Sequence, residues 1–491
     1  MFMNTVEAIL FDLDNTLLGT SKLEVVRRTR DMEKLEQLLP KMKLFKKILP
    51  TLESIKNKNI PLGIVTNSPR WYAERLLAYF NIEDYFSVII TYDEVKPYGE
   101  KPNARGINLA CEHLKIQNKS NVFYVGDQKI DIEASYAAGV TPLAPTWANI
   151  KMSQMPACIV STDEFIKQLS TPSNLILLAE AAAKNDNLTA IKGKKFYFVP
   201  LNMDGEVIMP ERKNIELITF GRYFTNKSEI TSTLRATHKL SMEISRKDTQ
   251  ENQESYSVPE YWTDLLFFVL KRLSDFLYEN ENYFDDFDIV TVIPSKQHKP
   301  ARLEQLLTRI EAKGELPYRF IPDMFYFADD AKSLKTLGGA AKRNEEVDKS
   351  LIFKEQYSNV IAGKKVIVID DVITTGATFK KAKRLLEDQN IERFLGVSIA
   401  KTVHSIGPQK ICPACGRPMR IIEGKINIPF WGCSGFHENI EQCTNIENLE
   451  VKDCPRCGDK LIKMSGKYGM FLSHDRKVYG SKCKHSESMR G

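Results

Sequence analysis

Short apolar runs rich in β-branched residues alternate with longer helical patterns over two stretches of this chain, and no other feature restricts its fold as strongly. The first stretch covers residues 1–150 and includes "EAILFDLD", "IPLGIVTN", "FSVIITY" and "NVFYVGD". The second covers residues 259–405 and includes "FDIVTVIPS", "KKVIVIDD" and "RFLGVSIA". Strands that alternate with helices form a parallel sheet covered by helices. The sequence therefore predicts two doubly wound α/β domains, with a linker and mixed connecting region over residues 151–258.

Length and composition agree with a multidomain globular protein. The 491 residues exceed what one hydrophobic core supports. Hydrophobic residues make up 43% of the chain and charged residues 27%, which excludes a disordered or fibrous class. The net charge of +6 is too small over this length to indicate an anionic partner by itself. The longest apolar run, "LLFFVL", cannot span a bilayer, and no charged-then-apolar leader follows Met1. We therefore expect a cytoplasmic protein with no membrane partner.

Polar residues follow the strands of the first stretch. In "AILFDLDNTL", Asp12 ends an apolar strand and Asp14 comes two residues later. Such side chains project from the carboxyl edge of the sheet, where open α/β sheets bind ligands. Taken alone, the pair would also fit a helix cap. Its context favours a ligand site over a helix cap, because further polar residues end later strands or precede a helix. They are Thr66 in "GIVTN", Lys101 in "GEKPN", and Asp127 and Asp131 in "VGDQKID".

In this order the motifs resemble those of the haloacid dehalogenase superfamily, in its phosphatase-like branch, over residues 7–148. The resemblance implies that Asp12 is the nucleophile of phosphoryl transfer and Asp14 the general acid and base. It also implies a bound Mg²⁺, because oxygen ligands suit a hard cation that holds phosphate. The implied ligands are Asp12, the Asp14 carbonyl and Asp127, with Asp131 as a further acidic candidate.

The same resemblance assigns two residues to the transferred phosphoryl group. Thr66 and Lys101 would bind it, and Lys96, which also precedes a proline, is the alternative lysine. The stretch between Asp14 and Thr66 leaves room for a small helical lid only. We therefore expect an open site that accepts bulky phosphomonoesters.

The run "VIVIDDVITTGATF", which begins at Val366, predicts a second phosphate site. Backbone N–H groups of a Gly-containing loop at a helix N-terminus bind anions, and threonine hydroxyls add donors. Beside the loop, Asp370 and Asp371 can accept hydrogen bonds from a vicinal diol. A phosphate site next to a diol acceptor describes a ribose 5-phosphate, and the run lacks the GK[ST] of a Walker-type loop. The predicted loop residues are Thr374, Thr375, Gly376, Ala377 and Thr378.

This run is identified as the 5-phosphoribosyl diphosphate motif of type I phosphoribosyltransferases, so both α/β domains are expected to be Rossmann-like. The resemblance covers about residues 260–404. "DIVTVIPSKQHK" resembles the pyrophosphate-binding strand and loop of such enzymes, with Ser295 and Lys296 as candidates. "AKRNEEVDKSLIF" resembles a segment of the competence protein F family, matched by Arg343 and Asn344, although the glutamine usual upstream in that family has no counterpart here. The implied ligand is 5-phosphoribosyl diphosphate or a ribonucleotide, with the base unassigned.

Seven of the nine cysteines lie beyond residue 411 in two segments that share one plan. CxxC pairs followed by two more ligands suit tetrahedral Zn²⁺, and their context resembles the zinc ribbons of type IA DNA topoisomerases. We expect one Zn²⁺ in residues 408–446 and another in residues 450–488. The first ligand set is Cys412, Cys415, Cys433 and Cys443, and the second is Cys454, Cys457, His474 and Cys483.

Basic and aromatic residues interleave in both ribbons, as a surface that stacks single-stranded nucleic acid requires. Protein docking, or packing on the catalytic domains, is the alternative. The leading hypothesis is a bifunctional enzyme of nucleotide or nucleic-acid metabolism, with a phosphatase site and a phosphoribosyltransferase site. The alternative is a nucleic-acid-binding protein that processes terminal phosphates and senses a nucleotide. The interleaved residues are Arg417, Arg420, Lys425, Phe430, Trp431 and Phe436, and then Lys463, Lys467, Tyr468, Phe471 and Lys482.

Overall fold

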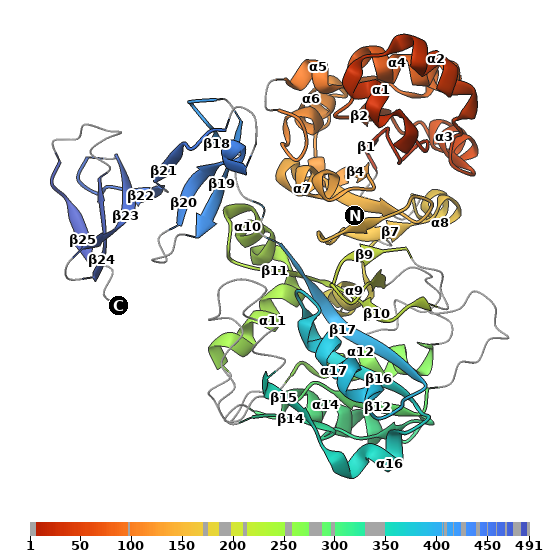
Figure 1. Cartoon of the computed structure of the whole chain (residues 1–491), viewed down its shortest axis with the longest axis vertical. Helices are drawn as coiled ribbons and strands as arrows, with labels where there is room; N and C mark the ends of the chain where they lie inside the picture. The colour runs from red at the N-terminus through yellow and green to blue at the C-terminus, as the bar shows by residue number, and fades with distance from the viewer. Residues whose placement is uncertain are drawn as a thin grey trace.

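A computed structural model of the chain contains two α/β units and two small β units. In Figure 1 the first unit, within residues 6–169, lies above the second, within residues 175–404, and the two ribbons lie to one side. The structure describes residues 6–96, 99–169, 175–185, 198–209, 214–250, 258–273, 287–295, 300–328, 349–404, 406, 410–415, 417–423, 429–437, 442–448, 450–457, 459–466, 469–474 and 483–488.

The first unit is built on a six-stranded parallel sheet with the order β3-β2-β1-β4-β5-β7. Each strand is a short run of buried apolar residues, as expected for a sheet covered on both faces. The strand order reverses between β1 and β4, so the ends of these two strands form the opening in which doubly wound sheets bind ligands. The strands are β1 (Ala8–Phe11), β2 (Leu62–Val65), β3 (Val88–Ile90), β4 (Val122–Val125), β5 (Thr141–Pro145) and β7 (Cys158–Val160).

Helices cover this sheet on both faces. The segment after β1 carries α1 and α2, and the other helices connect successive strands or follow the last one. The helices are α1 (Glu24–Thr29), α2 (Met32–Leu38), α3 (Ile48–Lys56), α4 (Arg70–Tyr79), α5 (Tyr92–Val95), α6 (Arg105–His113), α7 (Lys129–Ala138) and α8 (Thr162–Gln168).

The second unit is built on a nine-stranded mixed sheet with the order β13-β12-β16-β17-β10-β8-β9-β6, in which β11 also pairs with β17. The strands from β13 to β10 are parallel, and β8, β9 and β6 add an antiparallel edge. The strands are β6 (Lys151–Met152), β8 (Val199–Leu201), β9 (Val207–Ile208), β10 (Leu217–Thr219), β11 (Arg222–Phe224), β12 (Ile289–Val292), β13 (Arg319–Phe320), β16 (Lys365–Ile373) and β17 (Arg393–Val403).

Amphipathic helices cover the second sheet as well. The helix α17, for example, buries Phe379, Ala382 and Leu386 on one face. A separate pair, β14 (Phe325–Phe327) and β15 (Leu351–Phe353), is antiparallel. The helices are α9 (Leu178–Asn185), α10 (Glu229–Thr237), α11 (Lys239–Gln250), α12 (Glu260–Lys271), α14 (Arg302–Glu311), α16 (Ser358–Ile361) and α17 (Ala377–Glu387).

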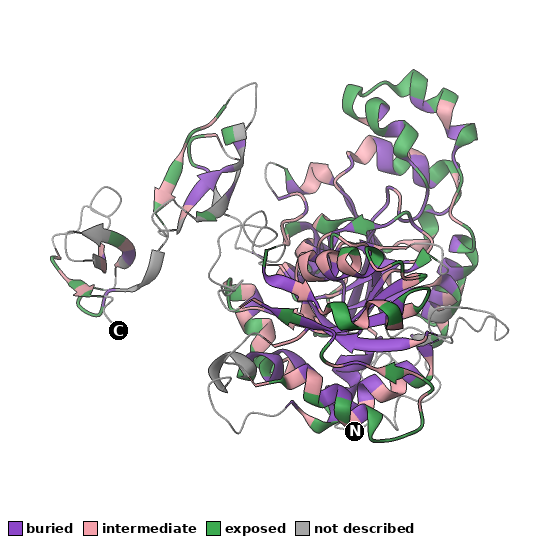
Figure 2. Cartoon of the chain, turned by 60° about the horizontal axis from the view of Figure 1, so that its bottom comes forward, coloured by how far each residue is buried: buried purple, intermediate pink, exposed green. Residues whose placement is uncertain are grey.

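The two units share a hydrophobic core. Tyr136 and Ile159 from the first unit belong to the same buried cluster as Val199 and Phe379 of the second. Figure 2 shows this continuity as buried strands that run through the middle of the molecule. The segment 151–258, expected to be a linker and mixed connecting region, supplies the strands β6 to β11, of which all except β7 join the second sheet. The second sheet therefore begins well before residue 259.

Each ribbon is a four-stranded antiparallel sheet. The first contains β18 (Lys410–Ile411), β19 (Pro418–Glu423), β20 (Pro429–Cys433) and β21 (Ile446–Asn448). The second contains β22 (Glu450–Asp453), β23 (Lys460–Gly466), β24 (Gly469–His474) and β25 (Ser486–Ser488). The predicted fold class, two α/β domains with two small zinc-type ribbons, is confirmed.

Candidate active sites and metal centres

Three strands of the first sheet bring polar residues to one edge. Asp12 follows β1, Thr66 follows β2, and Asp127 lies two residues after β4. Because β1 lies between β2 and β4 in a parallel sheet, these side chains meet at its carboxyl edge. All three are buried, and the Thr16 hydroxyl donates a 2.9 Å hydrogen bond to Asp127 Oδ1. The turn after β1 is thereby tied to the end of β4.

Lys101 lies at the centre of this group. Its Nζ is 2.6 Å from Asp12 Oδ1, 2.5 Å from Asp131 Oδ1 and 2.8 Å from the Tyr124 hydroxyl. Two hydrogen bonds with the Asn67 side chain, of 2.8 and 2.9 Å, hold the Lys101 backbone in place. The alternative lysine, Lys96, instead pairs with Asp93 at 2.5 Å, and its side chain is 46% exposed. The structure thus brings Lys101 to Asp12.

The charges of this cluster do not balance. Burial lowers the pKa of Lys101, but the charges of Asp12 and Asp131 outweigh it, so the pKa lies well above its ordinary value. Burial raises the pKa of Asp12, against the opposing charge of Lys101. Burial also raises the pKa of Asp127 to about 6, and the charge of Asp131 adds to this rise. One ammonium therefore faces three buried carboxylates.

A divalent cation would correct this imbalance, and the donor set fits one. Asp12, Asp127 and Asp131 each offer a carboxylate oxygen, and these oxygens lie within 4.8 Å of one another. Hard cations such as Mg²⁺ prefer oxygen ligands of this kind. The Asp14 side chain is not part of the cluster, so its predicted contribution rests on its backbone carbonyl.

The Asp14 side chain points to a different set of partners. The Tyr72 hydroxyl donates to Oδ1 at 2.8 Å, and the Ser68 hydroxyl donates to Oδ2. Arg27 Nη1, from the inserted helix α1, lies 3.0 Å from the same Oδ2 and donates to Ser68 Oγ at 2.9 Å. Sequence reasoning missed these partners. Ser68 follows Thr66 closely enough to have been suspected, whereas nothing local distinguishes Arg27 from its neighbouring arginines.

The second phosphate motif forms the predicted strand, loop and helix. The strand β16 runs to Ile373, the loop follows, and α17 begins at Ala377. Gly376 has a φ of +73°, and a Cβ there would lie 2.2 Å from the Met203 carbonyl oxygen. Only glycine suits this position, because both the backbone conformation and the close approach exclude a side chain. The turn between β8 and β9 therefore packs against the loop.

The paired acids of this motif already have partners. Asp371 is buried and lies 2.9 Å from Arg302 Nη1, whose side chain is 13% exposed. The Asp371 N–H donates to Asp370 Oδ1 at 2.8 Å. Ser295 accepts a 3.3 Å hydrogen bond from the Arg302 N–H, so this predicted residue lies beside the same arginine. Arg302 was not anticipated from the sequence.

Three predicted residues of this site, Lys296, Arg343 and Asn344, lie outside the described residues. A further lysine was missed. Lys401 in β17 is fully buried, and its Nζ donates a 3.4 Å hydrogen bond to the Thr374 carbonyl. Burial lowers the pKa of Lys401 to about 8, with the charge of Glu206 opposing this change.

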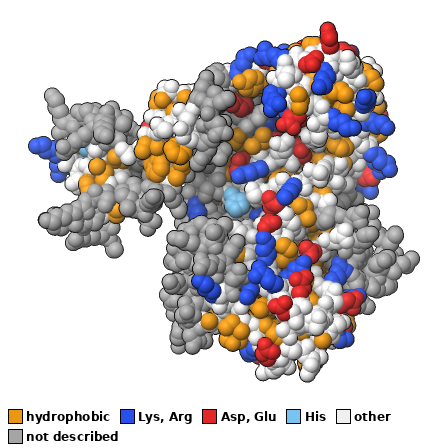
Figure 3. Space-filling model, in the orientation of Figure 1, with side chains coloured by type: hydrophobic (Ala, Val, Ile, Leu, Met, Phe, Trp, Pro, Cys, Tyr) orange, Lys and Arg blue, Asp and Glu red, His pale blue; other side chains and the backbone are white. Residues whose placement is uncertain are grey.

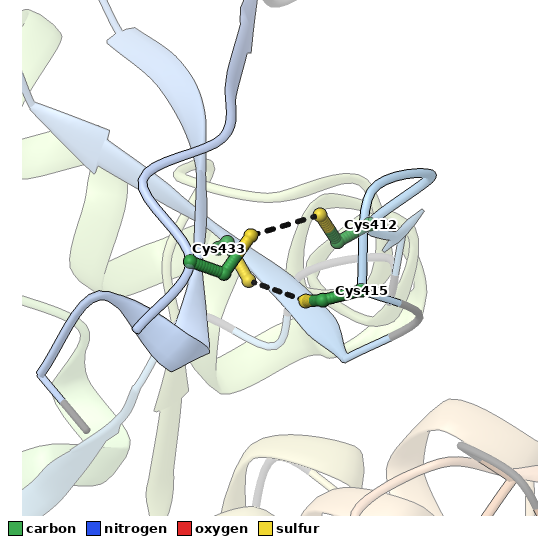
Figure 4. Close-up of side chains that lie close together, drawn as sticks. Cys412, Cys415 and Cys433 are labelled. Atoms are coloured by element: carbon green, nitrogen blue, oxygen red, sulfur yellow. Dashed lines mark hydrogen bonds between the residues drawn. The ribbon is translucent and has the colours of Figure 1, made fainter. Parts of the chain in front are cut away.

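The two cysteine groups gather as predicted. Figure 4 shows Cys412, Cys415 and Cys433 pointing toward one another. In this group the Cys415 and Cys433 sulfurs are 3.4 Å apart, and Cys412 lies 3.7 Å from Cys443. In each ribbon the four ligand atoms lie within 4.8 Å of one another, a donor set that fits tetrahedral Zn²⁺.

The second group includes the predicted histidine. His474 Nε2 lies 3.7 Å from Cys457 Sγ, and His474 is buried. Burial raises the pKa of Cys454, but N–H donors from Arg456 and Cys457 outweigh it and bring the pKa to about 6. In the same group the Asp459 N–H lowers the pKa of Cys457, but burial and the neighbouring Cys454 thiol outweigh it and raise this pKa to about 11.

The ribbon surfaces carry part of the expected aromatic and basic set. Phe436 is 48% exposed, whereas Trp431 is buried in the cysteine core and is not available for stacking. Arg417, Phe430, Lys463 and Phe471 are partly exposed. The Arg420 side chain and the residues Lys425, Lys467, Tyr468 and Lys482 lie outside the described set.

Family models match four segments of the chain. The model described as haloacid dehalogenase-like hydrolase matches residues 22–144, and the phosphoribosyl transferase domain matches residues 326–412. The topoisomerase DNA binding C4 zinc finger matches twice, at residues 409–450 and 451–475. The chain is a haloacid dehalogenase-like hydrolase domain joined to a phosphoribosyltransferase domain and two topoisomerase-type zinc ribbons. The suspected fusion is confirmed.

The curated relatives resemble the hydrolase domain. A phosphoglycolate phosphatase of Escherichia coli (strain K12) is 33% identical over 134 residues, which is 26% of this chain and 52% of the relative. A phosphoglycolate phosphatase of Shigella boydii is 29% identical over 165 residues, which is 33% of this chain and 64% of that relative. The chain thus spans between half and two thirds of the length of these relatives.

Solved structures resemble the same domain. A haloacid dehalogenase phosphatase of Thermococcus onnurineus is 23% identical and covers 28% of this chain and 85% of its own, with a TM-score of 0.25. CbbY of Rhodobacter sphaeroides, in complex with phosphate, is 19% identical and covers 29% of this chain and 86% of its own, with a TM-score of 0.25.

In the described part of this chain, no helix has both the length and the apolar composition that a bilayer crossing requires.

Proposed function

We propose that the chain is a bifunctional enzyme whose hydrolase domain cleaves phosphomonoesters with the help of Mg²⁺. The observation that carries this proposal is the contact of 2.6 Å between Lys101 Nζ and Asp12 Oδ1 among buried carboxylates. The ion would be held by Asp12, the Asp14 carbonyl and Asp127, with Asp131 as the further acidic candidate. When bound, it would neutralise phosphate charge.

In the proposed reaction, an Asp12 oxygen attacks phosphorus and the bond from phosphorus to the leaving oxygen breaks. Asp14 gives its proton to that oxygen, so an alcohol leaves and an aspartyl phosphate remains. Asp14 then takes a proton from water, which attacks phosphorus and restores Asp12. Lys101 and Thr66 hold the transferred phosphoryl oxygens. Arg27 Nη1 lies 3.0 Å from Asp14 Oδ2, so Arg27 would have to move away before this carboxyl group can reach the leaving oxygen.

The inserted segment that holds α1 and α2 is short, and this favours a wide range of substrates. These two helices have only 6 and 7 residues, although the residues of the site are buried and Arg27 of α1 contacts Asp14. A site covered by so small a lid accepts phosphomonoesters larger than phosphoglycolate, the substrate named for the curated relatives.

For the second domain we propose binding and transfer of a phosphoribosyl group from 5-phosphoribosyl diphosphate, or the reverse reaction on a ribonucleotide. Asp370 and Asp371 accept the ribose hydroxyls, and the loop from Thr374 to Thr378 binds the 5-phosphate through its N–H and hydroxyl groups. The buried position of Asp371 beside Arg302 supports this role, because the site holds a charged carboxylate ready at the sheet edge. Ser295, Lys296 and Arg343 are proposed to hold the pyrophosphate.

A cytoplasmic location is part of the proposal. None of the nine cysteines, all of which the structure describes, forms a disulfide, and seven of them belong to the two metal-type clusters. Cysteines used in this way are typical of a reducing compartment.

The experiment that tests the pair of activities is an untargeted search for metabolites consumed by the purified chain with Mg²⁺ and 5-phosphoribosyl diphosphate. Loss of a base together with 5-phosphoribosyl diphosphate supports the transferase, and release of inorganic phosphate supports the hydrolase. If neither change occurs in a broad metabolite extract, the proposal is refuted.

The two ribbons favour a second candidate, a nucleic-acid-binding protein that trims terminal phosphates. Both segments match zinc fingers named for DNA binding in topoisomerases. Figure 3 shows lysine and arginine side chains scattered among acidic ones on the face of the α/β units that is turned to the viewer. Tight binding of single-stranded DNA at physiological salt, without binding of 5-phosphoribosyl diphosphate, would favour the nucleic-acid-binding protein over the bifunctional enzyme.

A further inference from the structure

A cavity of about 760 Å³ lies where the hydrolase domain meets the phosphate loop of the second domain. Thr374 and Thr375 line it from the loop, and His404 lines it from the end of β17. Lys129 and Lys151 line it from segments that precede the second domain in sequence. The volume is in the range of small-molecule sites and exceeds what a water cluster needs.

The walls of this cavity are held together by direct contacts. The strand β6, which carries Lys151, pairs with β9 of the second sheet. The Gln154 side chain accepts a 2.8 Å hydrogen bond from the His404 N–H and donates one of 3.3 Å to the His404 carbonyl. The Tyr136 hydroxyl also lies 3.1 Å from Arg222 Nη1. These contacts join the walls that the two domains contribute to the cavity.

The helix α7 connects this cavity to the hydrolase site. It begins at Lys129, two residues after Asp127, and its third residue is Asp131, which contacts Lys101. One end of a single helix thus carries a lysine that faces the cavity and a carboxylate that faces the hydrolase cluster. The hydrolase site and the cavity are therefore neighbours across the first turn of α7.

The lining suits a phosphate ester that also carries hydroxyl groups. Threonine hydroxyls at the start of α17 and two lysines supply donors and positive charge for a phosphate. Lys401 lies buried beneath Thr374, and its ammonium forms no ion pair with any residue that the structure describes. The carboxylates of Asp204 and Glu206, which also line the cavity, can accept hydrogen bonds from ligand hydroxyls other than the two that Asp370 and Asp371 are proposed to hold.

The two lining lysines are not committed to strong ion pairs. Lys129 lies 3.5 Å from Glu133 and its side chain is 49% exposed, while Lys151 lies 3.4 Å from Glu206 and is 67% exposed. Exposed pairs at such distances contribute little stability, so either ammonium can turn to an anion at small cost.

We propose that this cavity binds a phosphorylated sugar or nucleoside monophosphate, and that Lys129 and Lys151 complete the phosphate site that the loop at Thr374 and Thr375 begins. This assignment rests on the proposed phosphoribosyl function of the second domain. It makes the hydrolase domain part of the phosphoribosyl site, so the second domain alone would bind its ligand less tightly.

Calorimetric titration of the full, zinc-loaded chain with ribose 5-phosphate tests this assignment. The double variant Lys129→Ala with Lys151→Ala should weaken binding at least about tenfold, because two charge-assisted contacts are lost. The matched control is Lys364→Ala, which removes an exposed lysine paired with Asp288 at 3.3 Å outside the cavity and should leave the affinity unchanged. Arginine at both positions should preserve most of the affinity.

A second variant should strengthen ribose 5-phosphate binding, whereas the double lysine variant should weaken it. Glu206→Gln removes a negative charge from the cavity wall with little change of shape, so it should tighten ribose 5-phosphate binding by about two- to threefold. Hydrogen exchange of β6 and β9 should stay as in the wild type in every lysine variant, which shows that the cavity walls remain paired.

The possible failures are distinguishable. If Thr375→Val abolishes binding while the double lysine variant binds within twofold of the wild type, the shared cavity is refuted and the phosphoribosyl function stands. If the wild type does not bind ribose 5-phosphate, or if Thr375→Val has no effect, the proposed function and the shared cavity both fail.

Discussion

Removing the Lys101 ammonium should destabilise the hydrolase domain strongly. In Lys101→Met, the carboxylates of Asp12 and Asp131 would remain 5% and 1% exposed with no ammonium between them. Breaking a buried ion pair in this way costs about 3–5 kcal/mol of unfolding free energy. The matched control is Lys96→Met, whose pair with Asp93 is largely exposed and should contribute about 0–1 kcal/mol.

The loss of unfolding free energy in Lys101→Met should depend on pH. Burial holds the pKa of Asp12 well above its ordinary value against the opposing charge of Lys101, so removing Lys101 raises this pKa further and the folded variant binds more protons than the unfolded chain. Its stability relative to the wild type should therefore fall as the pH rises through this pKa and recover in acid. At about pH 5 the cost should be smaller than at about pH 8, because protonation of the aspartates removes the unpaired charge.

Hydrogen exchange of peptides that cover β1 and β4 measures this free energy within the intact chain. Such peptides report the opening of the first sheet independently of the second domain and the ribbons. A cost below about 1 kcal/mol at about pH 8, or a cost that does not change with pH, would refute the reasoning. Either result would mean that the carboxylates are solvated or paired in another way.

Three further changes test the separate sites. Asp12→Asn should reduce phosphomonoester turnover below about a hundredth of the wild type without changing ribose 5-phosphate affinity, because it removes the nucleophile but keeps its shape; turnover assays above that level contradict the assigned role. Cys412→Ser with Cys415→Ser should release one zinc equivalent and unfold the first ribbon only, as metal analysis and hydrogen exchange will show; collapse of either α/β unit would make the ribbon part of their packing. Asp370→Asn with Asp371→Asn should weaken 5-phosphoribosyl diphosphate binding by about 1.5–3 kcal/mol for each lost hydrogen bond, measured by calorimetry, and leave phosphatase turnover intact; equal affinity would mean that the motif is scaffold only.

Local patterns in the sequence were enough to predict the two α/β domains, the ribbons and the residues at the strand ends. A run such as "VIVIDD" before "TTGAT" carries its strand, loop and helix within a few residues, so its structure depends little on distant contacts. Cysteine spacing works in the same way, because two sulfurs of a CxxC turn are already near each other and need only a second pair. These features could therefore be predicted without knowing which distant parts of the chain contact them.

Only the tertiary structure decided which distant groups meet. Lys101 and Lys96 both precede a proline, yet hydrogen bonds to the Asn67 side chain hold Lys101 beside Asp12, while Lys96 lies on the surface. Arg302 reaches Asp371 from 69 residues away, and Arg27 reaches Asp14 from an inserted helix.

The same holds for the shared cavity, one wall of which exists because β6, which follows the first sheet in the chain, pairs with β9 at the edge of the second sheet. The hydrophobic periodicity of a segment shows which of its faces is buried. The partner that buries that face is chosen by packing across the whole chain.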